Sequence, residues 1–224
     1  MNEVANGIAG SNIPMAILPF GTTNVLSKEL SIPEDVRGAL EVAVTKTPKT
    51  ISLGKIDSLC SAFSPRYFIL MAGIGYDGAT VFGINKTLKR LSGKGAYIYS
   101  GLRTLVGSHP SALAFNIDGT MYSGYSAIIG KASKYGGNFT VTPDARLTDP
   151  ALYICLFTGA TGLDMLRYVF GISVNRHLGF RDVKYMKAET IEISGKAHVQ
   201  IDGDYWGTTP VRIEVTKNII RLIY

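Results

Sequence analysis

The sequence has no long apolar run, and no stretch approaches the roughly 18 to 20 consecutive apolar residues that a membrane-spanning helix needs. Its N-terminus also lacks the basic segment followed by an apolar one that marks a secretory signal. The two cysteines, Cys60 and Cys155, have neither metal-ligand spacing nor a disulfide framework, so both are predicted to be small buried side chains. These absences predict a cytoplasmic protein without redox chemistry.

The composition is that of an ordinary globular protein: of 224 residues, 46% are hydrophobic and 18% are charged. The 25 glycines and 12 tyrosines favour many turns and strands. The formal net charge of +6 suits an anionic partner. Because no nucleic-acid-binding motif accompanies this charge, we expect an anionic membrane surface or a phosphorylated ligand and no nucleic acid.

The first 48 residues follow the rhythm of an α/β unit. The expected elements are a helix over residues 1–9, a strand over 13–18, a helix through Leu26 and Leu30, and a helix from Pro33. Proline and the acidic pair that follows it suit the first turn of this last helix. Its apolar stripe, Val36, Leu40 and Val44, must pack on a sheet, much of which the sequence does not contain. Unpaired strand edges would favour a homo-oligomer.

Beyond a boundary at residues 47–50, short strand-like segments dominate and predict a sandwich or open barrel. The expected strands are 50–56, 67–72, 112–117, 125–130, 152–157, 182–186, 190–193, 198–201, 211–215 and 219–223. Helices are expected at 85–106 and 163–170. The first of these has a basic start and could dock on an anionic lipid surface, or it is an ordinary helix with one solvated face. The sequence thus predicts an α+β fold with an α/β region, residues 1–48, and a larger β-sandwich-like region, residues 49–224.

A loop at Gly21, Thr22, Thr23 and Asn24 connects a strand to a helix. Backbone N–H groups at such a junction, aided by the helix dipole, favour an anion. The alternative is a capping turn, in which a threonine hydroxyl satisfies free amides.

The segment from Asn2 to Gly7, the strand after it and the Pro-x-Gly-Thr-Thr-Asn loop together resemble the nucleotide-binding half of the bacterial diacylglycerol kinase family. That family is related to sphingosine kinases and more distantly to NAD kinases. Its members carry a Gly-Gly-Asp-Gly-Thr loop directly before the Asn-Glu pair, so the chain resembles a family member that starts after this loop. The resemblance implies that residues 1–48 are a partial nucleotide-binding domain, in which Asn2, Glu3 and the Gly21–Asn24 loop bind ATP.

Asp77 follows an apolar strand and the Gly73-Ile74-Gly75 segment, whose glycines allow close backbone approach. By its position it could be a helix N-cap. By the resemblance it belongs to a charged network in the cleft between the domains.

An acidic side chain beside exposed loop carbonyls is what Mg²⁺ requires, and residues 143–150 offer one. The resemblance implies that Asp149 and the carbonyl groups of Arg146 and Ala151 hold Mg²⁺. Relatives have glycine where this chain has Pro150, and an Asp-Pro turn without a metal is the alternative.

Two Asp-Gly pairs lie between predicted strands, Asp118-Gly119 and Asp202-Gly203, and both have the local sequence of a hairpin turn. The surroundings of Asp202 resemble the catalytic Asp-Gly-Glu segment of the family, with Asp204 in place of glutamate. The resemblance therefore implies that Asp202 is the general base of an ATP- and Mg²⁺-dependent lipid kinase that works at the inner face of the membrane on diacylglycerol or a similar lipid. An inactive lipid-binding fragment and a soluble kinase of the NAD kinase type remain the alternatives.

Overall fold

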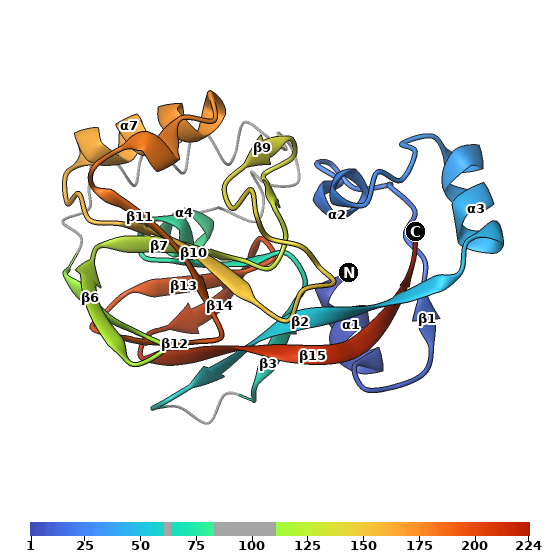
Figure 1. Cartoon of the computed structure of the whole chain (residues 1–224), viewed down its shortest axis with the longest axis horizontal. Helices are drawn as coiled ribbons and strands as arrows, with labels where there is room; N and C mark the ends of the chain where they lie inside the picture. The colour runs from blue at the N-terminus through green and yellow to red at the C-terminus, as the bar shows by residue number, and fades with distance from the viewer. Residues whose placement is uncertain (61–63, 83–110) are drawn as a thin grey trace.

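The computed structural model describes residues 1–60, 64–82 and 111–224 (Figure 1). The helices are α1 (Asn2–Ile8), α2 (Val25–Glu29), α3 (Val36–Thr45), α4 (Tyr76–Phe82), α7 (Gly162–Ser173) and a 3-10 turn η1 (His177–Gly179). The strands are β1 (Pro14–Met15), β2 (Pro48–Ser58), β3 (Arg66–Phe68), β4 (Met71–Ile74), β5 (Leu113–Ile117), β6 (Thr120–Gly124), β7 (Ser126–Gly130), β8 (Lys134–Tyr135), β9 (Phe139–Thr140), β10 (Leu152–Phe157), β11 (Val183–Ala188), β12 (Thr190–Ser194), β13 (His198–Ile201), β14 (Asp204–Thr208) and β15 (Val211–Ile223).

Most of these strands form a β-sandwich, as the sequence predicted. One sheet has the order β3-β2-β15-β12-β5-β6, and β1 joins it by pairing with β15. The other has the order β11-β10-β7-β4-β13-β14. The two sheets enclose an apolar core, to which β5 contributes Leu113, Phe115 and Ile117 at alternate positions because side chains of a strand alternate between its faces.

Three differences from the predicted strands have local causes. The predicted strand at 67–72 divides into β3 and β4, which lie in different sheets. The strands predicted at 211–215 and 219–223 are one strand, β15, with an irregularity in its pairing after Thr216. Strands β6 and β14 were not predicted, because they lie at sheet edges and expose most of their side chains.

The long strands β2 and β15 extend out of the sandwich toward the N-terminal elements (Figure 1). There β1 pairs in parallel with Arg221 and Leu222 of β15, so only two residues of the predicted 13–18 strand are a strand. Helix α3 begins three residues later than predicted, because Asp35 is its N-cap and accepts a hydrogen bond from Gly38 N at 2.8 Å.

The apolar stripe of α3 has no sheet beneath it in the described part of the chain. Val36, Leu40 and Val44 are 45%, 46% and 79% exposed. Cys60 is exposed as well, contrary to the prediction, whereas Cys155 is buried and burial raises the pKa of its thiol to about 12.

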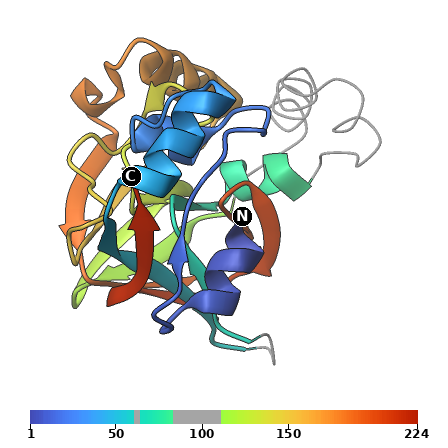
Figure 2. The same ribbon diagram turned by 90° about the vertical axis from the view of Figure 1, so that its right-hand side faces the viewer.

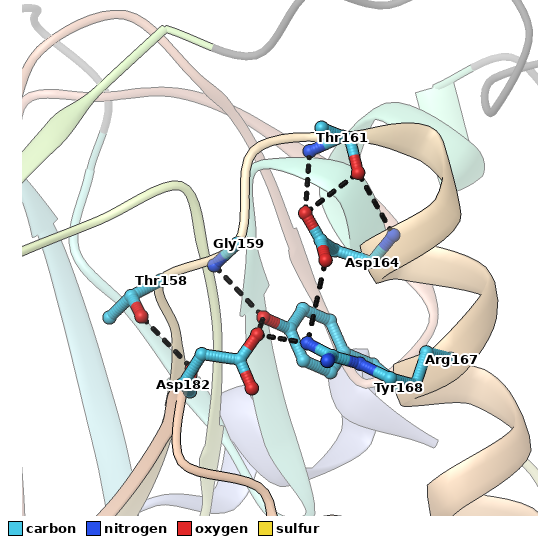
Figure 3. Close-up of polar contacts among 7 residues, drawn as sticks. All are labelled: Thr158, Gly159, Thr161, Asp164, Arg167, Tyr168 and Asp182. Carbon is cyan, nitrogen blue, oxygen red and sulfur yellow. Dashed lines mark hydrogen bonds and ion pairs between the residues drawn. The ribbon is translucent and has the colours of Figure 1, made fainter.

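Helix α7 corresponds to the helix predicted at 163–170 and lies against the β10–β11 side of the sandwich (Figure 1). A capping box of Thr161 and Asp164 starts it. Figure 3 shows Arg167 and Tyr168 reaching from α7 to Asp182, and Gly159 N donates to the Tyr168 hydroxyl at 2.9 Å. These contacts fix which face of α7 is turned toward the sheet.

Among the described residues no helix is long and apolar enough to cross a membrane. The helix predicted at 85–106 lies outside the described residues.

Candidate functional site

Asp202 lies at the tip of the β13–β14 hairpin and contacts α1 through Asn2. Figure 2 shows α1, in dark blue, beside strands drawn in red. Its Oδ2 accepts hydrogen bonds from Asn2 Nδ2 at 2.8 Å and Ile69 N at 2.9 Å. Its Oδ1 accepts from Leu70 N at 2.8 Å and Met71 N at 3.1 Å. The carboxylate therefore joins the first helix, the β3–β4 connection and the hairpin at one point.

The environment of Asp202 acts on its pKa in two directions. Burial raises the pKa above that of an exposed aspartate, and the hydrogen bonds from Ile69, Asn2, Leu70 and Met71 oppose that rise. A carboxylate accepts about four hydrogen bonds, so all its acceptor positions are in use. A substrate hydroxyl could donate to Asp202 only after one of these donors has moved away.

Asn2 is the one side-chain donor among the four, because the others are backbone N–H groups. Its Nδ2 also donates to Tyr67 O at 2.9 Å. Asn6, one turn later, exchanges two hydrogen bonds with the backbone of Tyr67. Helix α1 would thus stay bound to β3 even if the hydrogen bond from Asn2 to Asp202 were broken.

Asp77 lies in the first turn of α4 and is 8% exposed. It is not a cap: its carboxylate accepts from the Tyr135 hydroxyl and from Gln200 Nε2. Burial raises its pKa, and these two bonds oppose the rise. Gln200 Oε1 in turn accepts from Gly203 N at 2.8 Å, so Asp77 is linked to the turn that carries Asp202.

Gly73 is needed for this arrangement. A Cβ atom at Gly73 would lie 1.6 Å from Asp77 Oδ2 and 2.6 Å from Gln200 Nε2. The close backbone approach that the sequence predicted for this glycine is therefore confirmed, and its partner is the buried carboxylate.

The Gly21–Asn24 loop is closed by Asn24, which accepts from Gly21 N at 2.7 Å and donates to Pro19 O at 2.8 Å. Asn24 has a positive φ of 47° and precedes α2, but no side chain caps that helix. Thr22 is exposed, and within the described part of the chain neither its hydroxyl nor that of Thr23 makes a hydrogen bond. The threonine capping turn is therefore not observed.

Helix α2 connects this loop to the sandwich through Glu29. Its carboxylate accepts hydrogen bonds from Ser133 N at 3.1 Å, Ser133 Oγ at 2.8 Å and Lys134 N at 3.0 Å. The sequence interpretation did not identify Glu29, since its partners are more than 100 residues away.

Two acidic side chains lie apart from this cluster. Glu3 is exposed, and its carboxylate is 3.4 Å from the N-terminal amine. Asp204 is exposed on β14. The structure therefore brings Asn2 and Asp77 to the Asp202 turn and leaves Glu3 at the surface.

The loop proposed to hold Mg²⁺ contains a turn in which Asp149 N donates to Arg146 O at 3.1 Å. The same carbonyl accepts from the ammonium of Lys131, which also donates to Leu147 O at 3.1 Å. A carbonyl oxygen has two lone pairs, and both are in use on Arg146. The donor set does not fit Mg²⁺ while the lysine is there. Among the described residues no group of three or more His, Cys, Asp or Glu side chains is placed to bind a metal.

Lys131 is fully buried, and the sequence interpretation missed it. Burial lowers the pKa of its ammonium to about 8, against the opposing effect of Asp149 and Glu29. The signal in the sequence is a lysine directly after the apolar strand β7, a position that usually lies at the surface.

Residues 71–224 match the family described as the YegS C-terminal NAD kinase beta sandwich-like domain, and residues 1–56 match the diacylglycerol kinase catalytic domain. The chain belongs to the diacylglycerol kinase family. Members of this family are transferases that phosphorylate a lipid alcohol.

Diacylglycerol kinases of Bacillus subtilis (strain 168) and Staphylococcus aureus (strain Newman) are 26% and 30% identical to the chain over 217 residues. The alignments cover 94% of the chain and 69% and 66% of the two relatives, so the chain spans about two thirds of their length.

Two crystal structures from Bacillus anthracis (strain Sterne) show the same fold. One, of a diacylglycerol kinase, has a TM-score of 0.67 at 20% identity and covers 99% of this chain and 71% of its own. The other has a TM-score of 0.75 at 24% identity and covers 100% of this chain and 73% of its own. The predicted α+β fold is confirmed.

Proposed function

We propose that this protein is an ATP-dependent kinase that phosphorylates the hydroxyl of diacylglycerol or a similar lipid. The observation that carries the proposal is the position of Asp202. It is the point where α1, from the region matching the catalytic domain, meets the β13–β14 hairpin, from the region matching the sandwich domain. A base at such a junction can face a nucleotide bound by one region and a lipid bound by the other.

In the reaction, Asp202 accepts the proton of the lipid hydroxyl while that oxygen bonds to the γ-phosphorus and the bond from this phosphorus to the β-phosphate oxygen breaks. Because the carboxylate is fully hydrogen-bonded, Asn2 must first release it; a side-chain amide can rotate away, whereas the backbone donors are held in place. Burial raises the pKa of Asp202, which makes it a better base than an exposed aspartate.

The Gly21–Asn24 loop is the candidate contact for the phosphates. Thr22 is exposed there, and Asn24 keeps the loop closed. Mg²⁺ carried with ATP would neutralise charge on the phosphates, since phosphoryl transfer depends mainly on positioning and charge neutralisation. The Gly-Gly-Asp-Gly-Thr loop expected before Asn2 in the family is not among these 224 residues.

An anionic membrane surface is the proposed second partner, with α7 as its contact. The outward face of α7 and its C-cap exposes Leu163, Leu166, Val169, Phe170 and Val174, between 43% and 79%. The exposed basic residues Arg176, Arg181 and Lys187 follow within one short segment of the chain, and the net charge is +6. Apolar side chains beside basic ones suit the interface of an anionic bilayer.

Transfer of radiolabelled phosphate from ATP to diacylglycerol in mixed micelles tests the proposed activity. The assay compares the 224-residue chain with a chain in which the Gly-Gly-Asp-Gly-Thr loop precedes Asn2. Labelled phosphatidic acid from the extended chain supports the proposal. Transfer to NAD instead would favour the soluble alternative, and lipid binding without transfer by either chain would contradict a kinase.

Vesicle co-sedimentation tests the membrane contact. Phe170→Glu should weaken binding to phosphatidylglycerol vesicles by about tenfold, because it places a charge in the apolar face. Val44→Glu is the matched control, because Val44 is also an exposed apolar residue on a helix but lies on α3. Equal loss in both variants would argue against α7 as the contact.

A further inference from the structure

Lys131 occupies the centre of the loop that was expected to bind a metal. Its side chain is fully buried at the end of β7, and its ammonium donates to the carbonyl oxygens of Arg146 and Leu147. Those carbonyls belong to the turn that ends at Asp149. Backbone carbonyls beside a carboxylate form the kind of oxygen-lined site that binds a hard cation.

The charges around Lys131 favour its own ammonium group over a Mg²⁺ ion from solution as the cation that binds the Arg146 carbonyl. Asp149 and Glu29 both act electrostatically on the ammonium. A Mg²⁺ ion bound to Arg146 O would have to displace the ammonium from that oxygen and would lie close to a second positive charge. Two cations that share one buried carbonyl oxygen repel each other strongly, because the repulsion is poorly screened there.

The lysine also connects the loop to Asp202 through the backbone. Lys131 N donates to Leu70 O at 2.8 Å, and Leu70 N donates to Asp202 Oδ1 at 2.8 Å. On the other side, Ser52 N donates to Leu147 O at 2.9 Å, which ties the loop to β2. A cation bound in the Arg146–Asp149 loop therefore helps to hold the backbone at Leu70, which donates to the proposed base, Asp202.

We propose that the ammonium of Lys131 takes the place of a structural metal ion in the Arg146–Asp149 loop, so that this loop is held together without a divalent cation. The proposal concerns this loop and is independent of any Mg²⁺ that ATP brings. It does not rest on the proposed kinase activity, and its test needs neither ATP nor a lipid.

The test is a Mg²⁺ titration of the melting temperature of the 224-residue chain and of two variants. The wild type should show no saturable rise with MgCl₂, and Asp149→Asn should behave in the same way. Lys131→Ala should melt roughly 5 to 10 °C lower, because the carbonyl oxygens of Arg146 and Leu147 each lose the charged one of their two hydrogen-bond donors. It should then gain a saturable rise with MgCl₂, because the vacated carbonyls and Asp149 become available to the ion.

Two controls separate a cation site from general destabilisation. Lys134→Ala removes a nearby lysine whose side chain is half-buried and should give no Mg²⁺ response. Adding Asp149→Asn to Lys131→Ala should abolish the gained response. Lys131→Asn is made in parallel, so that a folded variant is available if the alanine variant does not fold.

Two results would overturn the proposal. One is a saturable Mg²⁺ response of the wild type that Asp149→Asn removes, which would show that metal and lysine are bound together. The other is a folded Lys131 variant that never responds to Mg²⁺, which would show that the loop is not a cation site.

Discussion

The two Asp-Gly hairpins of this protein provide a matched test of the catalytic assignment. Asp202 and Asp118 both adopt positive φ angles, 50° and 47°, and each is followed by a glycine with positive φ. Both carboxylates accept backbone N–H bonds from a neighbouring segment, since Asp118 is bound by Glu189 N and Thr190 N. The turns therefore share their conformation and their type of anchoring, and they differ in what lies beside them.

Asp202→Asn should lower the turnover rate by about 10² to 10⁴, because an amide cannot accept the lipid proton. This corresponds to about 2.7 to 5.5 kcal/mol of transition-state stabilisation. ATP affinity should stay near that of the wild type, because Asp202 is not expected to contact the nucleotide. Asp118→Asn should leave the rate within a few-fold.

The same substitution also has a structural cost that must be measured separately. An asparagine offers one oxygen to four donors, so at least two N–H groups then face its amide hydrogens. Each buried unsatisfied group costs about 1 to 3 kcal/mol. Urea denaturation should therefore show a loss of about 2 to 5 kcal/mol for Asp202→Asn, and about 1 kcal/mol or less for the exposed Asp118→Asn.

The rates are measured by radiolabelled phosphate transfer to diacylglycerol, in the chain that carries the upstream loop and at a temperature where both variants are folded. Comparable rates for folded Asp202→Asn and Asp118→Asn would refute the general-base assignment. Asp202 would then be an anchor that joins three segments, with no part in the proton transfer.

Three further predictions concern other parts of the chain. The 224-residue chain should bind ATP weakly because the glycine loop expected before Asn2 is not part of it; micromolar affinity by calorimetry would contradict this. Burial raises the pKa of Asp77 above 3.8, so its contribution to stability is complete at low pH and is lost as pH rises through the folded-state pKa. The difference in unfolding free energy between wild type and Asp77→Asn should therefore fall as pH rises above 3.8, and a constant difference would contradict this. The exposed stripe on α3 should cause self-association that Val44→Glu reduces in sedimentation experiments, unless the wild type is already monomeric at all concentrations.

The sandwich could be predicted from the sequence because most of its strands are short apolar segments between recognisable turns. β10 and β13 were predicted at their observed bounds, and β5 within one residue. Edge strands were missed where burial is slight, as in β14 with its exposed Asp204 and Tyr205. The pattern of apolar residues along a strand reflects which side chains are buried. A strand that buries few side chains therefore has a weak pattern.

The candidate site was only partly predictable, because its contacts join residues far apart in the chain. The resemblance assigned both Asp202 and Asn2 to the site. Their hydrogen bond could not be predicted, because the two residues are 200 positions apart in the sequence. Lys131 was missed for a related reason. A lysine after an apolar strand reads as a surface residue, and its burial is explained by carbonyl groups 15 and 16 positions later.

The polar groups around Asp202 form two independent supports, and this bears on how the base could be freed for catalysis. One support runs through Leu70 to Lys131 and the Arg146–Asp149 loop, and the other through Gly203 and Gln200 to Asp77. Both end in buried charged groups and act through the backbone on either side of the carboxylate. Asn2 belongs to neither support. Release of the one hydrogen bond from Asn2 to Asp202 would therefore open one acceptor position on Asp202 while the turn, the strands and the carboxylate stay where they are.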